Sequence, residues 1–122
     1  MVQFNYTALA RQADRVMRRY GRAPHSAYLR REGSTRAVTI FEADYGPDER
    51  VGLVEAEDVR YYLSIYTPDG LELFPPPDHE LDELVLVNPE DSTETVYLLA
   101  SAPKQMSPGS INVFWQLHCR AR

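Results

Sequence analysis

The class of fold is decided by residues 111–120, which read INVFWQLHCR. Apolar side chains stand at every odd position, and the even positions between them are polar except for Phe114. A β-strand places every second side chain on the same face, so this alternation predicts a strand with one face on a core. The face predicted to be buried carries Ile111, Val113, Trp115, Leu117 and Cys119.

Shorter β signals lie upstream of this strand. The nearest, Thr95–Ala100, is followed by the turn residues Ser107-Pro108-Gly109, so we expect it to pair antiparallel with the last strand. Asp44–Arg50 is expected to be a loop, because glycine, proline and acidic residues interrupt it. The other predicted strands are Ala27–Arg31, Ala37–Ala43, Val51–Val54, Val59–Ile65 and Leu81–Val87, with a turn at Glu32-Gly33-Ser34 between the first two.

One amphipathic helix is predicted at about residues 6–20, ahead of all the strands. Its apolar stripe has helical spacing, and Gly21 is expected to end it in a left-handed conformation. The opposite face is basic, which fits either a solvated helix face or a face that docks an acidic partner. The apolar stripe is Leu9, Ala10, Ala13, Val16, Met17 and Tyr20, and the docking face is Arg11, Arg15, Arg18 and Arg19.

These elements predict a single domain, residues 1–122, with its β region at about 26–120. We expect a mainly β (α+β) fold: a small antiparallel, partly open β-barrel or sandwich with one N-terminal helix and long loops. Cys119 is the only cysteine, which excludes an internal disulfide and favours a reducing compartment. No apolar run approaches the roughly 20 residues of a membrane helix, so a soluble, unexported protein is expected.

The net charge of −5 is unevenly distributed. Residues 1–37 carry +6, residues 38–100 carry −14 and residues 101–122 carry +3. Such asymmetry favours oriented contacts between unlike surfaces, although helix and loop surfaces that simply differ in charge would also produce it. An acidic segment would also suit the lining of a DNA conduit, since it repels phosphates instead of gripping them.

Reactive side chains form no recognisable motif. Cys119 follows His118, but neighbours on a strand point to opposite faces, so Cys119 is expected to be a small core residue. Asp78-His79-Glu80 with Asp82 is interpreted as a solvated loop. The histidines lack metal-ligand spacing, and Gly-rich phosphate loops and Gly-x-Ser-x-Gly elbows are absent from the sequence. We therefore expect no enzyme activity, no metal and no cofactor.

Short groups of residues stand in a particular order along the chain. They are Ala8-Leu9-Ala10, Ala13-Asp14, Tyr20-Gly21, Tyr28-Leu29-Arg30-Arg31, Glu42, Asp44-Tyr45, Glu49-Arg50-Val51-Gly52, Asp58, Tyr62-Leu63-Ser64, Pro77, Asp82, Val96-Tyr97, Pro108-Gly109 and Trp115-Gln116-Leu117. In this order, over nearly the whole chain, they resemble the small head–tail joining proteins of siphophages and prophages, also called neck, stopper or head-closure proteins.

The resemblance implies a structural virion protein built as a partly open β-barrel with a helix and long loops. It implies a homo-oligomeric ring of six or twelve copies between the portal–adaptor assembly of the head and the tail terminator. Packaged double-stranded DNA would pass through the ring without sequence-specific binding and be retained until ejection. The expected location is the neck of the virion, after assembly in the bacterial host cytoplasm.

The resemblance also implies roles for particular segments. The predicted helix matches the N-terminal helix of such proteins. Asp44–Leu53 matches a loop that they use for ring or channel contacts. The chain departs from their pattern at Leu71–Pro77, where Phe74 and three prolines form an extension, so contacts near it are not carried over. The expected ring or channel residues are Asp44, Tyr45, Asp48, Glu49 and Arg50.

Three alternatives remain open on the sequence alone. The chain could be a tail terminator or minor tail protein of the same virions. It could be a cellular barrel that binds a small molecule or peptide, which a deep apolar pocket in place of a filled core would favour. It could be a small hydrolase, which requires a buried carboxylate or thiol with a base at hydrogen-bond distance.

Overall fold

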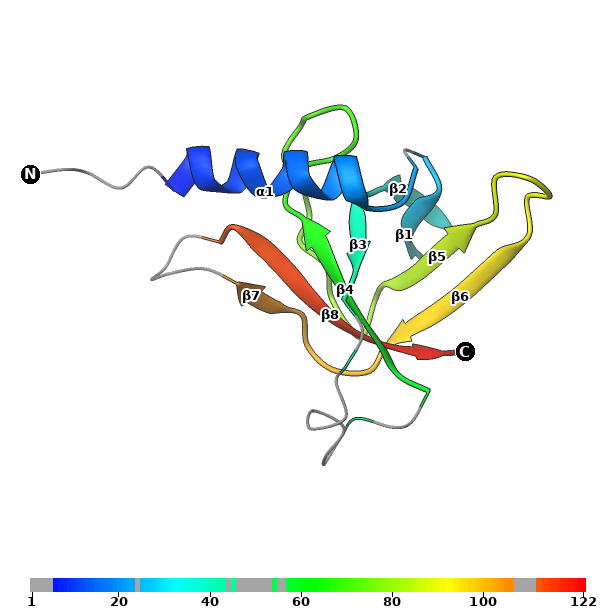
Figure 1. Ribbon diagram of the computed structural model, residues 1–122. Coiled ribbons are helices and arrows are strands. Elements are labelled where there is room, and N and C mark those ends of the chain that lie inside the picture. Colours follow the sequence, from blue (N-terminus) through cyan, green and yellow to red (C-terminus); the bar gives the residue numbers. More distant parts are fainter. Residues whose placement is uncertain (1–5, 24, 44, 46–53, 55–56, 107–111) are drawn as a thin grey trace, which may run out of the picture.

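The structure, a computed structural model, describes residues 6–23, 25–43, 45, 54, 57–106 and 112–122. Within these residues it has one helix and eight strands, and the fold is mainly β, as predicted (Figure 1). The elements are α1 (Tyr6–Tyr20), β1 (Ala27–Arg31), β2 (Ser34–Ala37), β3 (Ile40–Glu42), β4 (Val59–Ser64), β5 (Glu83–Val87), β6 (Glu94–Leu99), β7 (Lys104–Met106) and β8 (Phe114–Ala121). Within the described part of the chain, no helix combines the length and apolar character that crossing a membrane requires.

All the strands belong to one antiparallel sheet, in the order β2-β1-β5-β6-β8-β4-β3, with β7 paired to β8 beside the end of β6. The two edge strands, β2 and β3, follow each other in the chain with only Val38 and Thr39 between them. Val38 N donates to Ala27 O at 3.0 Å, and Ser64 N donates to Thr39 O at 3.0 Å. The sheet therefore curls until its two edges meet at one corner, and it stays open elsewhere.

The predicted strand Ala37–Ala43 is wrong, because this segment crosses the corner. Its first part pairs with β1 and its second part with β4, so the chain changes partner at Val38 and Thr39. The turn before it is shorter than expected. Only Glu32 and Gly33, with φ of 50° and 84°, lie between the paired residues Arg31 and Ser34.

The other predicted strands agree more closely with the observed ones. Ala27–Arg31 is confirmed, Val59–Ile65 extends one residue past the end of β4, and Thr95–Ala100 is shifted by one residue from β6. Leu81–Val87 contains β5, which begins at Glu83. The last strand pairs antiparallel with β6 as expected. In the chain an additional strand, β7, lies between β6 and β8, and it also pairs with β8. Most of Val51–Val54 lies outside the described residues.

The interior of the curled sheet is filled. Leu29, Leu63, Leu84, Leu117 and Cys119 are fully buried in one apolar cluster, which confirms Cys119 as a core residue. The predicted faces of β8 need two corrections. Trp115, expected to be buried, packs against this cluster but is only half-buried. His118, on the face expected to be polar, is buried.

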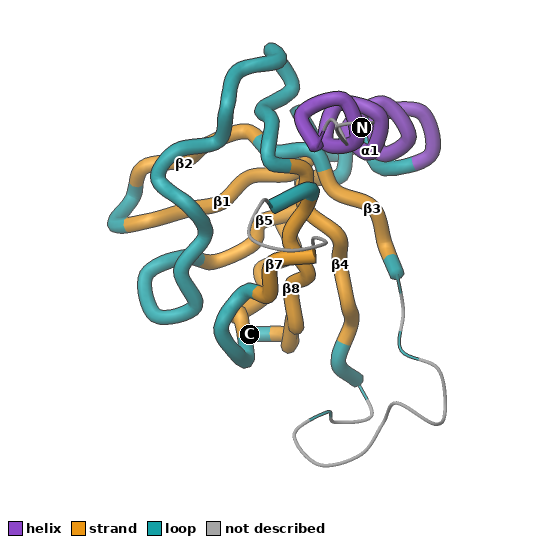
Figure 2. The backbone as a smooth tube through the Cα atoms, turned by 90° about the vertical axis from the view of Figure 1, so that its left-hand side faces the viewer, coloured by secondary structure: helices purple, strands orange, loops and turns teal. Residues whose placement is uncertain are grey.

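Helix α1 lies across the outside of the sheet and contacts β3, β4 and β8 (Figure 2). Gly21 follows it but does not adopt a left-handed conformation, contrary to prediction. Its amide donates to Met17 O at 2.7 Å. A β-carbon at Gly21 would collide with the carbonyl oxygens of Met17 and Ile40. The glycine therefore serves the close approach of the chain to β3.

Candidate docking surface

A polar contact sets the rotation of α1 on the sheet. Asp14 is 5% exposed and accepts a 2.6 Å hydrogen bond from Ser64 Oγ on β4. Its second oxygen accepts a 2.8 Å hydrogen bond from Arg18 Nε. Ala10 and Met17 are buried on the same side of the helix. Because this bond turns Asp14 inward, the buried face of α1 is rotated away from the centre of its apolar stripe.

The rotation leaves part of the apolar stripe uncovered. Val16 and Tyr20 were expected to face the core, yet they are 48% and 65% exposed. Leu9 and Ala13 are half-buried at the edge of a small apolar cluster beneath the helix. The predicted stripe therefore has two parts. One part packs against the sheet, and the other faces an open groove.

This apolar groove runs between α1 and the outer face of the sheet and has a volume of about 640 Å³. Phe114, the single apolar residue on the predicted polar face of its strand, lies here with its ring 5.0 Å from that of Tyr62. The groove is lined by Leu9, Gln12, Ala13, Val16, Met17, Phe41, Tyr62, Met106, Val113 and Phe114. Nearly all of this lining is apolar, so the groove suits an apolar side chain from another molecule.

Two of the four arginines in the predicted docking face are used within the chain. Arg18 donates to Pro68 O and Thr67 O, both at 2.8 Å, besides its bond to Asp14. Arg11 donates to Gly70 O at 3.2 Å and stacks over the ring of Tyr66 at 3.8 Å. These two arginines fasten the loop after β4 to the helix. Arg15 and Arg19 are exposed, and their docking role remains a prediction.

Most of the predicted ring or channel loop lies outside the described residues, including Asp44, Asp48, Glu49 and Arg50. Tyr45 is described and half-buried. Its ring meets that of His118 edge-on at 5.6 Å, and the Arg60 guanidinium lies 5.0 Å from its centre. Tyr45 therefore packs against β4 and β8, and a contact with another subunit stays a prediction.

A buried ionic cluster ties the chain before β4 to β8. The carboxylate of Asp58 is fully buried and accepts two 3.0 Å hydrogen bonds from Arg120. His118 Nε2 lies 2.6 Å from Asp58 Oδ2, and Ser101 Oγ lies 3.3 Å from His118 Nδ1. Asp58 lies 60 residues before His118 and 62 before Arg120, and Ser101 lies 17 before His118, so spacing gave no signal for this cluster. The inward position of His118 follows from its bond to Asp58.

The order serine, histidine, aspartate invites comparison with hydrolytic triads. Here the aspartate is also paired with Arg120, and neither Ser101 nor His118 lines the apolar groove. Cys119, next to the histidine, is a poor nucleophile for a different reason. Burial, and then the charge of Asp58, raise the pKa of its thiol to about 12, so the reactive thiolate is disfavoured. The cluster works chemically as a buried cross-link, while the serine–histidine contact keeps a hydrolase among the alternatives.

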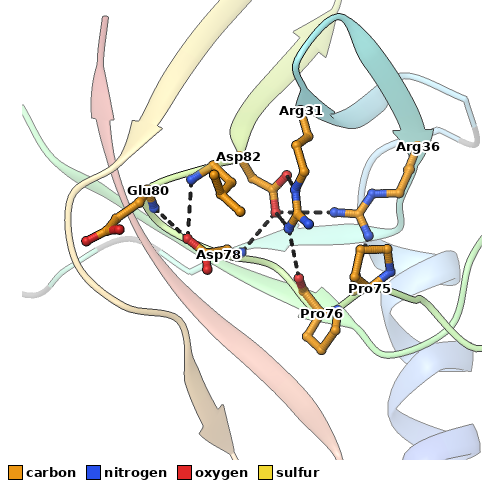
Figure 3. A network of polar contacts seen from close by, with 8 residues as sticks. Arg31, Arg36, Pro75, Pro76, Asp78, Glu80 and Asp82 are labelled. Carbon is orange, nitrogen blue, oxygen red and sulfur yellow. Dashed lines mark hydrogen bonds and ion pairs between the residues drawn. The ribbon is translucent and has the colours of Figure 1, made fainter.

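A second buried carboxylate organises the proline-rich extension (Figure 3). Asp82 is fully buried and accepts hydrogen bonds from Arg31 at 2.8 and 2.9 Å and from Arg36 at 3.2 Å. The same arginines donate to Pro76 O and Pro75 O. Hydrogen bonding to Asp82 raises the pKa of Arg31. Part of the predicted solvated cluster at Asp78–Asp82 is therefore structural, which corrects the interpretation for Asp82.

Other ion pairs neutralise much of the charge asymmetry inside the fold. Arg30 pairs with Glu83 at 3.0 Å and with Glu94 at 3.3 Å, and Arg122 also reaches Glu83 at 3.1 Å. Within the described residues, no three histidine, cysteine or acidic side chains gather in a way that could hold a metal. The exposed acids that remain include Glu90, at the tip of the β5–β6 hairpin.

Comparisons with protein-family models, with curated proteins and with solved structures find no match to this chain.

Proposed function

We propose that this chain is a structural assembly subunit, and specifically a subunit of the neck ring that joins the head of a tailed phage to its tail. The observation that carries the proposal is the open apolar groove beside α1. Exposed apolar surface of this kind marks interaction sites, since water contact with it is unfavourable until a partner covers it. The resemblance in residue order supplies the particular assembly.

Two further features support a ring subunit over a binding barrel. The interior of the sheet is filled by leucines, so the groove lies outside the barrel, where a neighbouring protein can reach it. The tip of the β5–β6 hairpin carries the exposed acids Glu90 and Asp91. Hydrogen bonds from Thr93, backbone first, lower the pKa of Asp91, so this tip stays negative and would repel the phosphates of DNA in a channel.

The experiment is co-expression with the proteins encoded beside this chain, followed by electron microscopy of the purified complexes. We expect rings of six or twelve copies stacked on a portal–adaptor or tail-terminator ring. A chain that stays separate from every such protein would contradict the proposal. Rings found only at the tail end would favour the alternative of a tail terminator or minor tail protein.

A small hydrolase is the second candidate, favoured by the contact of Ser101 with His118 and of His118 with Asp58. It predicts covalent labelling of Ser101 by a fluorophosphonate probe and loss of that labelling in His118→Ala. Absence of labelling in the intact chain would remove this candidate.

The groove volume also falls within the range of small-ligand sites, about 300–1,000 Å³. Titration with apolar ligands would test that reading.

A further inference from the structure

The loop that follows β4 carries the most exposed large apolar side chain in the described part of the molecule. Phe74 is 82% exposed and Leu71 is 69% exposed. Between them Leu73 points inward and is buried in the core. We name residues 66–74 the Phe74 loop. An exposed aromatic beside an aliphatic side chain is the composition of a binding anchor, since such residues dominate the energetics of interfaces.

The Phe74 loop is held in one conformation before any partner arrives. Its backbone bonds join Thr67 N to Leu71 O and Leu73 N to Ile65 O, both at 2.7 Å. Arg18 and Arg11 on α1 bind three of its carbonyls, as described above. On the far side, the arginines around Asp82 bind the carbonyls of the next two residues, Pro75 and Pro76 (Figure 3). Little ordering would remain for a binding event, which favours affinity.

The Phe74 loop and the apolar groove lie on opposite flanks of α1. Successive residues of a helix are about 100° apart, so Arg18, which binds the loop, stands about 200° round the axis from Val16, which lines the groove. Arg11 and Leu9 have the same separation. Figure 1 shows the loop rising beside the helix. Because the loop is fastened to its own flank, it is not placed to fill the groove of its own chain.

The two surfaces are complementary in charge. The Phe74 loop carries the exposed acids Asp69 and Glu72. The groove is bordered by bases: Arg19 follows Gln12 by seven residues on the same side of α1, and Lys104 precedes Met106 by two on β7. Opposite charges around an apolar contact orient the partners and discourage wrong pairings.

We infer that the Phe74 loop of one copy docks in the apolar groove of a second copy, with Phe74 as the inserted side chain. The contact joins two different patches, so it is head-to-tail and continues from copy to copy with α1 as the wall between successive contacts. A phenylalanine buries roughly 150–250 Å², far below the roughly 800 Å² per partner of a stable complex. Each contact is therefore weak alone. The inference deepens the proposed function, and it rests on that proposal for the closing of such contacts into a ring.

The test is disulfide trapping between two variants of the intact chain, Phe74→Cys and Val16→Cys. The native Cys119 is fully buried and serves in both as an unreactive background. Mixed in equal amounts and oxidised mildly at high concentration, they should form the mixed 74–16 dimer at least about tenfold faster than either symmetric dimer. Glu90→Cys, exposed on the β5–β6 hairpin, replaces Phe74→Cys in the control and should give only background. Faster 16–16 coupling would overturn the inference in favour of symmetric groove-to-groove packing, and equal rates for all pairs would overturn it as random collision.

Sedimentation at high concentration gives an independent readout. Phe74→Ser should weaken self-association at least about tenfold while the melting temperature stays unchanged, and Phe74→Leu should retain most of the association. Unchanged association in Phe74→Ser would overturn the inference. If the intact chain stays monomeric yet binds head or tail proteins, the inference fails and the proposed function stands. If the 74–16 contact forms but virion proteins do not bind, the inference stands and the neck role fails.

Discussion

The two apolar regions of this molecule are built in opposite ways. Inside the curled sheet, leucines from four strands bury one another completely, and the region is closed to water. Beneath α1, a smaller apolar cluster lies beside the hydrogen bond between Asp14 and Ser64, and two of the six residues in the apolar stripe, Val16 and Tyr20, stay exposed. The first region stabilises the fold, whereas the second fixes an orientation and leaves apolar surface available. Apolar residues in one small domain can therefore serve the chain itself or a neighbour, depending on what positions them.

The largest effect on the free energy of unfolding is expected from a substitution inside the curled sheet. Leu117→Ala should lower the free energy of unfolding by about 3–5 kcal/mol, because it removes buried methyl groups and leaves a cavity. Val16→Ala, which also removes apolar atoms but at the groove, should change it by less than about 0.5 kcal/mol. Urea unfolding of both variants checks this. A loss below about 1 kcal/mol for Leu117→Ala would mean that the interior is not the stabilising region.

The next largest effect on stability is expected from the hydrogen bond that joins α1 to β4. Asp14→Ala should cost about 2 kcal/mol, because the buried hydroxyl of Ser64 loses its acceptor and Arg18 loses its carboxylate partner, while Tyr66 N still donates to Ser64 Oγ. Amide hydrogen exchange in α1 should rise while β4 and β8 stay protected, since the strands do not depend on this bond. Gln12→Ala, an exposed change on the same helix, is the control and should leave both measurements unchanged. Exchange that rises equally in helix and strands would show that the two regions are one cooperative unit.

Alkaline pH should weaken the interior selectively. The pKa of the Cys119 thiol is raised to about 12 by burial, whereas an unfolded thiol ionises near about 8.5. The unfolded state therefore loses its proton first, so stability is complete below about pH 8.5 and falls as pH rises toward 12, by about 1 kcal/mol per unit. Burial also raises the pKa of Tyr61, which adds to the loss above about pH 10. Urea midpoints from pH 8 to 10 should fall less steeply for Cys119→Ala, and equal slopes would contradict this origin.

The smallest effect on stability is expected at the groove. Val16→Ser should leave the free energy of unfolding within about 0.5 kcal/mol, because the side chain is half exposed and valine and serine have similar helix propensity. Binding of an apolar fluorescent dye should nevertheless fall, since the substitution makes the groove wall polar. Ala8→Ser, exposed on the same helix, is the matched control and should leave dye binding unchanged. Equal dye binding in both variants would place the accessible apolar surface elsewhere.

The interior was largely predictable from the sequence, because its signals are local. Alternation along residues 111–120 gave the final strand, and the apolar runs gave β1, β4 and β6 nearly to the residue. The change of partner between β2 and β3 was not predictable, since no glycine or proline interrupts the strand-like run Ala37–Ala43 at the corner. The change depends on the positions of β1 and β4 in the folded sheet, because β2 pairs with β1 and β3 pairs with β4.

The docking surface was less predictable, because distant pairs create it. The apolar stripe of α1 was recognised, but its rotation depends on Asp14 meeting Ser64, 50 residues away. Apart from the pair of Arg18 with Asp14 one helical turn away, Arg11 and Arg18 bind loop carbonyls about 50–60 residues away, which no spacing rule can reveal. One usable signal was present: Phe114 breaks the polar face of its strand, and that exception lines the groove.

Ser64 stands where two separate joints of the molecule coincide. Its amide bonds to Thr39 at the corner that unites the two edges of the sheet, and its hydroxyl bonds to Asp14 on the helix. A mechanical pull on α1 would therefore reach the corner of the sheet through Ser64, alongside the bonds of Arg11 and Arg18 to the loop after β4. A subunit built this way bears load as a single body, because its outermost element is anchored at the place where the fold closes on itself.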